Sequence, residues 1–171
     1  MNVFDFAMQM EVDGKAYYEK LAEQSSLPGL RTIFTHLAED EQKHFEIFQA
    51  LRSGSKAPVM QESTALVAAR NIFAELLKGA EGDAGGTDDL AAYRYAMKLE
   101  ADSFRLYEDA AAKEAETEIR GLLLKVAEEE RKHFSILENI FHFVNAPNQY
   151  LAWGEFSNLE EFRQFGRNTG I

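Results

Sequence analysis

Two copies of a Glu-x-x-His pattern limit the possible fold of this chain more than any other sequence feature. One copy holds Glu41 and His44, and the other holds Glu130 and His133. Residues three apart share one face of an α-helix, so each carboxylate points the same way as its imidazole. A buried carboxylate needs a compensating charge, and the pattern therefore predicts a metal site. The rest of each face is apolar: Ile33, Phe34, Leu37, Phe45, Phe48 and Leu51 around the first copy, and Leu122, Leu123, Val126, Phe134, Leu137, Ile140 and Phe141 around the second.

Both copies lie inside a longer internal repeat. Residues 7–51 align without a gap with residues 96–140, at an offset of 89. Fifteen of the 45 paired positions are identical, against about three expected from ordinary composition. The identical pairs include Glu11 with Glu100 and Tyr18 with Tyr107. The repeat predicts a duplicated helical hairpin with pseudo-two-fold symmetry.

Apolar periodicity predicts an all-α chain of four long helices and one short helix. Breaks at 27–29 and 114–117 close two antiparallel hairpins, and the segment 53–87 forms a crossover with one short helix. We predict a four-helix bundle over residues 1–146 and a tail, 147–171, that docks on the bundle or on a partner subunit. The expected helices cover 3 to about 25, 29–52, a stretch within 53–87, a stretch that begins near Thr87 or Asp88, and about 117–145.

The hairpin geometry brings the repeated polar residues to one level of the bundle. Glu11 and Glu41 lie 15 residues on either side of position 26, and Glu100 and Glu130 lie 15 residues on either side of position 115. Residues equidistant from an antiparallel turn lie at the same height. Four carboxylates and two imidazoles can hold two divalent cations and suit iron, manganese or zinc. The predicted metal ligands, and hence the catalytic residues, are Glu11, Glu41, His44, Glu100, Glu130 and His133. Two tyrosines, Tyr18 and Tyr107, are expected to hydrogen-bond to ligand carboxylates.

The other polar residues near the two motifs have a simpler interpretation. His36 and His142 fall on other sides of their helices and are predicted to lie at the surface. Asp13 and Asp102 are two residues from a ligand Glu and are expected to be solvated. Four acids in the charge runs fit either ligand orientation or a solvated surface: Glu39, Asp40, Glu128 and Glu129.

Composition limits the possible partners and compartments. The net charge of -11 argues against binding to nucleic acid or to an anionic membrane surface. The chain has no Cys, which excludes disulfides and thiolate metal sites. It shows neither a basic leader nor an apolar run of membrane-spanning length, so we expect a cytoplasmic protein. The aromatic residues of the tail predict packing on the bundle or on a second copy, as in a homodimer: Trp153, Phe156, Phe162 and Phe165.

With these motifs, the chain resembles the ferritin-like di-iron proteins, and within them the rubrerythrin-like branch. The resemblance covers residues 3 to about 144 and rests on one Glu from each of two helices and a Glu-x-x-His from each of the other two. It implies a di-iron centre in which Glu41 and Glu130 bridge the metals and Glu11 and Glu100 are terminal. His44 and His133 would each bind one metal.

The chain also departs from that family. Without Cys it has no rubredoxin domain, which implies that a separate protein donates electrons. Ser103 stands where rubrerythrins carry a further Glu, so the resemblance does not extend to their redox-linked ligand switching. Gln42 stands where bacterioferritins have their haem-binding Met, and haem is not implied. Gly14 leaves room beside the cluster for a small oxidant.

Three functions remain open at this level. The first is a non-haem di-iron oxidoreductase that reduces hydrogen peroxide or dioxygen. The second is iron handling, as a ferroxidase or a storage protein. The third is a non-catalytic bundle that binds zinc. Metal stoichiometry and oxidant turnover distinguish them.

Overall fold

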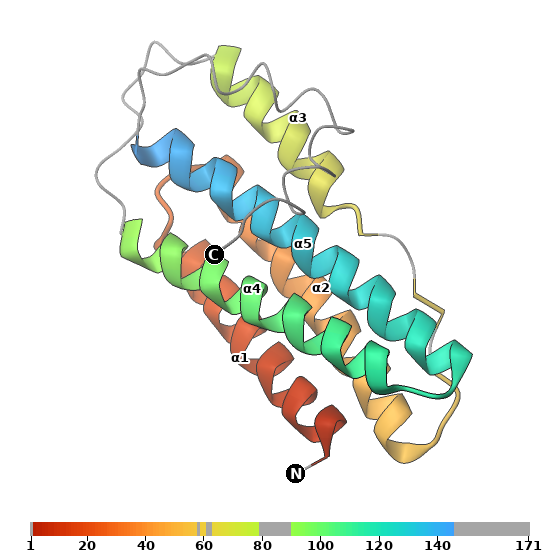
Figure 1. The fold of residues 1–171 in the computed structure, drawn as a ribbon. Coiled ribbons are helices and arrows are strands. Elements are labelled where there is room, and N and C mark those ends of the chain that lie inside the picture. Colours follow the sequence, from red (N-terminus) through yellow and green to blue (C-terminus); the bar gives the residue numbers. More distant parts are fainter. Residues whose placement is uncertain (1, 58, 61–62, 79–89, 146–171) are drawn as a thin grey trace.

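The computed structural model is an all-helical bundle, and it describes residues 2–57, 59–60, 63–78 and 90–145 (Figure 1). No strand occurs in these ranges, as the sequence predicts. Helix bounds agree with the predicted ranges to within a few residues. The expected N-cap at Thr87 or Asp88 and the whole tail, 147–171, lie outside the described residues. The helices are α1 (Val3–Gln24), α2 (Pro28–Ser53), α3 (Ala65–Lys78), α4 (Leu90–Lys113) and α5 (Thr117–Asn145).

Local signals explain where the first two helices begin and end. The Asn2 side chain accepts a hydrogen bond of 2.9 Å from the Phe4 N–H and so caps α1. Pro28 occupies the first turn of α2, where its missing N–H costs no helical hydrogen bond. Gly54 ends α2 in the left-handed conformation, at φ 66°, which glycine adopts without strain.

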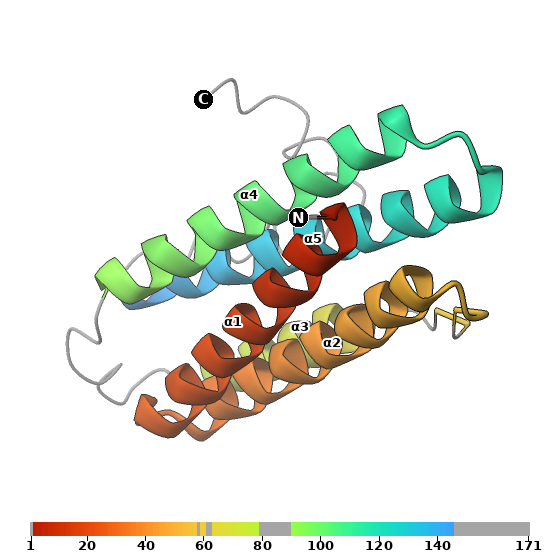
Figure 2. The same cartoon turned by 90° about the horizontal axis from the view of Figure 1, so that it is seen from below.

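The four long helices form two hairpins. α1 packs along α2, and α4 packs along α5. The hairpins meet with α1 beside α4 and α2 beside α5, while α3 packs outside this arrangement on α2 and α5 (Figures 1 and 2). The structure thus confirms the ferritin-like four-helix arrangement with a crossover helix. Within the described ranges, every helix is too short or too polar to cross a bilayer.

Two apolar clusters divide the core. One contains Phe34, Leu37 and Ile136 together with Phe73 of α3. The other contains Phe48 and Val126 and lies nearer the opposite end of the bundle. On α2 and α5 the Glu-x-x-His motifs fall between these clusters. The polar motifs therefore occupy a layer that apolar side chains seal at both ends.

Candidate metal centre

All six predicted ligands meet in this layer. α1 and α4 each contribute one glutamate, and α2 and α5 each contribute a glutamate and a histidine one turn apart. No member is more than 4% exposed. The structure thereby brings together Glu11, Glu41, His44, Glu100, Glu130 and His133, and metal binding by them stays a prediction.

Each histidine faces glutamates from both hairpins. The Nδ1 atom of His44 lies 2.9 Å from a Glu130 oxygen and 3.6 Å from a Glu11 oxygen. The Nδ1 atom of His133 lies 3.1 Å from a Glu41 oxygen and 3.6 Å from a Glu100 oxygen. The contacts obey the sequence repeat, since each residue of one half has its counterpart 89 positions away.

The donor atoms fall into two overlapping groups. In each group, one donor atom per residue lies within 4.8 Å of the others. One group contains Glu11 and His44, the other contains Glu100 and His133, and both contain Glu41 and Glu130. Two neighbouring cations that share two carboxylates would fit this arrangement.

Unpaired polar atoms support the fit to cations. Among the described residues, several buried donor atoms of the cluster lack a hydrogen-bond partner. Buried polar atoms without partners are rare because each forfeits its interaction with water. Carboxylate oxygens and imidazole nitrogens suit iron, manganese and zinc. The atoms are Glu11 Oε2, Glu41 Oε1, His44 Nδ1, Glu100 Oε2, both Glu130 carboxylate oxygens and His133 Nδ1.

Burial and neighbouring charges shift the pKa of most ionisable side chains in the layer. Burial, and then the charge of Glu130, raises the pKa of Glu41 and of Glu100 well above the usual value. Burial alone would lower the pKa of both histidines, but the charge of Glu130 raises that of His44 and the charge of Glu100 raises that of His133. Burial opposes ionisation of Glu130 too, yet its close contacts with Glu100 and with the two histidines hold its pKa well below the usual value. Protons therefore bind the cation-free cluster tightly, and metal binding must displace them.

Two tyrosines hold the terminal glutamates from the opposite hairpin. The Tyr18 hydroxyl donates a hydrogen bond to Glu100, and the Tyr107 hydroxyl donates one to Glu11. Burial raises the pKa of both tyrosines, and the glutamate charges raise it further, so the hydroxyls remain donors. The predicted tyrosine–carboxylate contacts are confirmed, with each tyrosine contacting a glutamate of the other repeat.

Two acids lie behind the histidines, a role that the sequence left open. The Nε2 atom of His133 lies 3.3 Å from Asp40 Oδ2, and the Nε2 atom of His44 lies 3.0 Å from Glu129 Oε2. Asp40 and Glu129 are 2% and 5% exposed and are paired by the repeat. Such acids orient a histidine and direct its other nitrogen to a metal. The signal in the sequence was that each is an acid four residues before a motif histidine.

The remaining candidates lie at the surface, which was predicted for the two histidines and the two aspartates and left open for Glu39 and Glu128. His142 is exposed, and His36 is half-buried beside Glu39, 3.5 Å away. Asp13 and Asp102 are exposed, and so are the two acids of the charge runs that do not face a histidine, Glu39 and Glu128.

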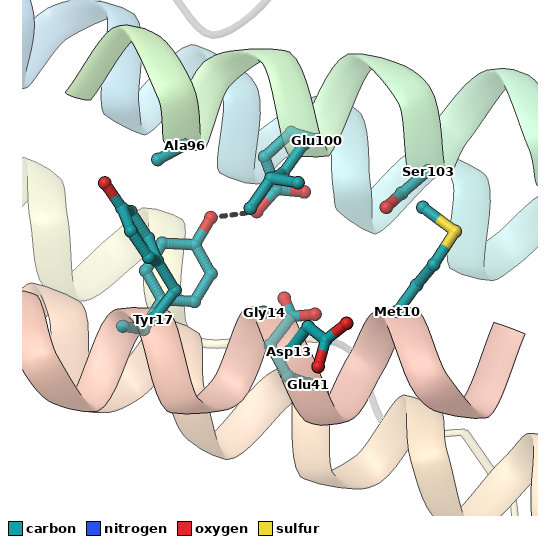
Figure 3. Close-up of a pocket in the computed structure, with 10 residues that line it drawn as sticks. Met10, Asp13, Gly14, Tyr17, Glu41, Ala96, Glu100 and Ser103 are labelled. Carbon is teal, nitrogen blue, oxygen red and sulfur yellow. Dashed lines mark hydrogen bonds between the residues drawn. The ribbon is translucent and has the colours of Figure 1, made fainter. Parts of the chain in front are cut away.

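A small cavity of about 60 Å³ reaches the cluster between α1 and α4 (Figure 3). Glu41 and Glu100 line it, together with Gly14 and Ser103, which the repeat pairs with each other. A Cβ atom on Gly14 would lie 2.9 Å from Glu41 Oε2, closer than such atoms normally approach. Glycine thus lets the Glu41 carboxylate lie against α1. The cavity has room for molecules about the size of water or peroxide.

Comparison with known proteins agrees with this geometry. A family model described as Rubrerythrin matches residues 2–141. Neither the curated proteins nor the solved structures gave a match.

Proposed function

Because this chain belongs to the rubrerythrin family, whose members are ferritin-like di-iron proteins, we propose that its buried cluster is an oxidoreductase centre that reduces hydrogen peroxide or dioxygen. One observation carries the proposal. Two groups of buried donor residues share Glu41 and Glu130, and among the described residues several of their donor atoms lack a hydrogen-bond partner. The donor set would also accept manganese or zinc. Iron is proposed because reduction of an oxidant needs a metal that can give up electrons, and because the family is a di-iron family.

Each residue of the layer has a defined role in this proposal. Glu41 and Glu130 would bridge two ions, Glu11 and His44 would complete one site, and Glu100 and His133 would complete the other. The tyrosine hydroxyls hold the terminal carboxylates in place, and the apolar clusters exclude water from the layer. Molecules about the size of hydrogen peroxide would fit the cavity beside Gly14.

Iron would supply the electrons for the reaction. Reduction of one hydrogen peroxide to two waters takes two electrons and two protons, and a ferrous pair held by these residues would supply the two electrons. The chain has no Cys to hold a rubredoxin-type iron, so another protein would return the electrons.

Oxidant challenge of the reduced protein tests this function. The metal-free protein is loaded anaerobically with ferrous iron and mixed with hydrogen peroxide or with air-saturated buffer, and ferric absorbance is followed. We expect rapid oxidation by at least one oxidant, at two irons per chain, and repeated turnover when a reductant is supplied. Hundreds of irons per assembly would instead support storage. Tight zinc binding without oxidant turnover would support the non-catalytic bundle.

Substitution of Gly14 by leucine is expected to slow oxidation of the reduced centre by about tenfold or more. The new side chain would fill the cavity and meet the Glu41 carboxylate, since even a Cβ atom would lie 2.9 Å from it. A misplacement of about 1 Å can reduce a rate by about a hundredfold. Stopped-flow absorbance after mixing with peroxide measures the rate.

The matched control is Ala16→Leu, which adds the same side chain at an exposed position two residues along α1. It should leave the rate unchanged. Equal rates in the wild type and the Gly14→Leu variant would show that oxidant does not enter beside α1.

A further inference from the structure

Ser63, in the segment that leads into α3, contacts both of the acids behind the histidines. Its hydroxyl donates a hydrogen bond to Asp40 Oδ2, and its backbone N–H donates one of 2.9 Å to Glu129 Oε1. The hydroxyl oxygen also accepts a hydrogen bond of 3.1 Å from the Ala65 N–H at the start of α3. Ser63 lies outside both repeats, so it has no symmetry-related counterpart.

The two acids serve different halves of the centre. Asp40 belongs to the first hairpin and contacts His133 of the second, while Glu129 belongs to the second and contacts His44 of the first. Ser63 therefore joins two hydrogen-bonded chains that end at two different predicted metal sites. Ser63 thus lies on the side of the layer formed by α2 and α5, whereas the cavity lies on the side between α1 and α4.

The two contacts of Ser63 differ in kind. The contact to Asp40 uses the side chain, and the contact to Glu129 uses the backbone. Among the described residues, the further partner of Asp40 besides Ser63 and His133 is Lys43, whose Nζ atom lies 2.8 Å from Oδ1. Lys43 is half-exposed and holds only the other oxygen, so the hydroxyl of Ser63 restrains the oxygen that faces His133.

We propose that Ser63 is a positioning residue of the metal centre, which orients His133 through Asp40 by its hydroxyl and His44 through Glu129 by its N–H. The inference rests on the proposed metal centre. It makes a selective prediction, because a substitution can remove the hydroxyl while the N–H remains. Loss of the hydroxyl should weaken the site of His133 and leave the site of His44 nearly unchanged.

Cobalt titration of the metal-free protein tests the proposal without measuring activity. The two stepwise dissociation constants for Co²⁺ are obtained from visible absorbance for the wild type, Ser63→Ala and Ser63→Thr. Loss of an outer hydrogen-bond partner typically reduces metal affinity by about 10- to 100-fold. We expect Ser63→Ala to weaken one constant by about tenfold and Ser63→Thr, which keeps the hydroxyl, to restore it. Thr64→Ala, at the exposed neighbouring position, is the control and should bind as the wild type does.

A double-substitution cycle separates positioning from a role in capping α3. If Ser63 acts through Asp40, then Ser63→Ala should have little further effect in an Asp40→Ala background. Additive losses, equal weakening of both constants, or no loss in Ser63→Ala would each overturn the inference. A wild-type chain that binds no cobalt would instead overturn the proposed function, so the two failures are distinguishable.

Discussion

Replacement of Glu130 by alanine is expected to abolish binding of both metal ions. Both donor groups include Glu130, and both of its oxygens are buried without a hydrogen-bond partner among the residues that the structure describes. Removal of a terminal ligand such as Glu11 affects one group alone, whereas loss of Glu130 takes a ligand from each. Metal analysis of the protein after anaerobic loading and desalting should therefore fall from two irons per chain to nearly none.

Glu128→Ala is the matched control. It removes an acid from the same helix two residues away, where the side chain is exposed. This variant should retain both ions. Retention of two tightly bound ions by Glu130→Ala would show that the ligand assignment is wrong.

Metal binding is expected to stabilise the fold strongly. Without cations, the layer buries four carboxylates whose mutual repulsion and desolvation oppose folding. A ligand that binds only the folded state adds about 4 kcal/mol to the free energy of unfolding when its free concentration is a thousandfold above its dissociation constant. With two sites, the gain should approach twice that value, and urea unfolding monitored by circular dichroism with and without ferrous iron or Co²⁺ measures it.

The Glu130→Ala variant distinguishes site binding from general effects of the metal. In that variant, added metal should leave the urea midpoint unchanged, because the shared ligand is missing. A wild-type midpoint that does not move with metal would indicate that the layer is stable without cations, as a proton-neutralised cluster.

Short-range periodicity and the repeat explain why so much of this centre could be predicted. Glu41 and His44 lie one turn apart on a helix, so their common face follows from spacing alone. The offset of 89 then transfers the same geometry to Glu130 and His133. Equal distances from a shared turn place Glu11 level with Glu41 and Glu100 level with Glu130, which needs no knowledge of how the hairpins dock.

The contacts between hairpins could not be predicted in the same way. Asp40 and Glu39 are adjacent acids, yet one is buried against His133 and the other is exposed. The difference depends on how α2 is rotated against α5, and the periodicity of a single helix does not determine that angle. The crossed tyrosine contacts depend on the same docking.

The contacts of Ser63 with the two acids could not be predicted from the sequence for a different reason. Ser63 precedes α3 in a segment without periodicity, and it has no counterpart in the repeat. Its position follows from the packing of α3 against α2 and α5, which involves contacts distant in the sequence.

Anomalous diffraction from crystals loaded anaerobically with ferrous iron tests the central claim most directly. Data collected on either side of the iron absorption edge should show two peaks inside the layer. One should lie next to Glu11 and His44, the other next to Glu100 and His133, with Glu41 and Glu130 between them. A layer without anomalous density, or iron bound only at exposed carboxylates, would contradict the account.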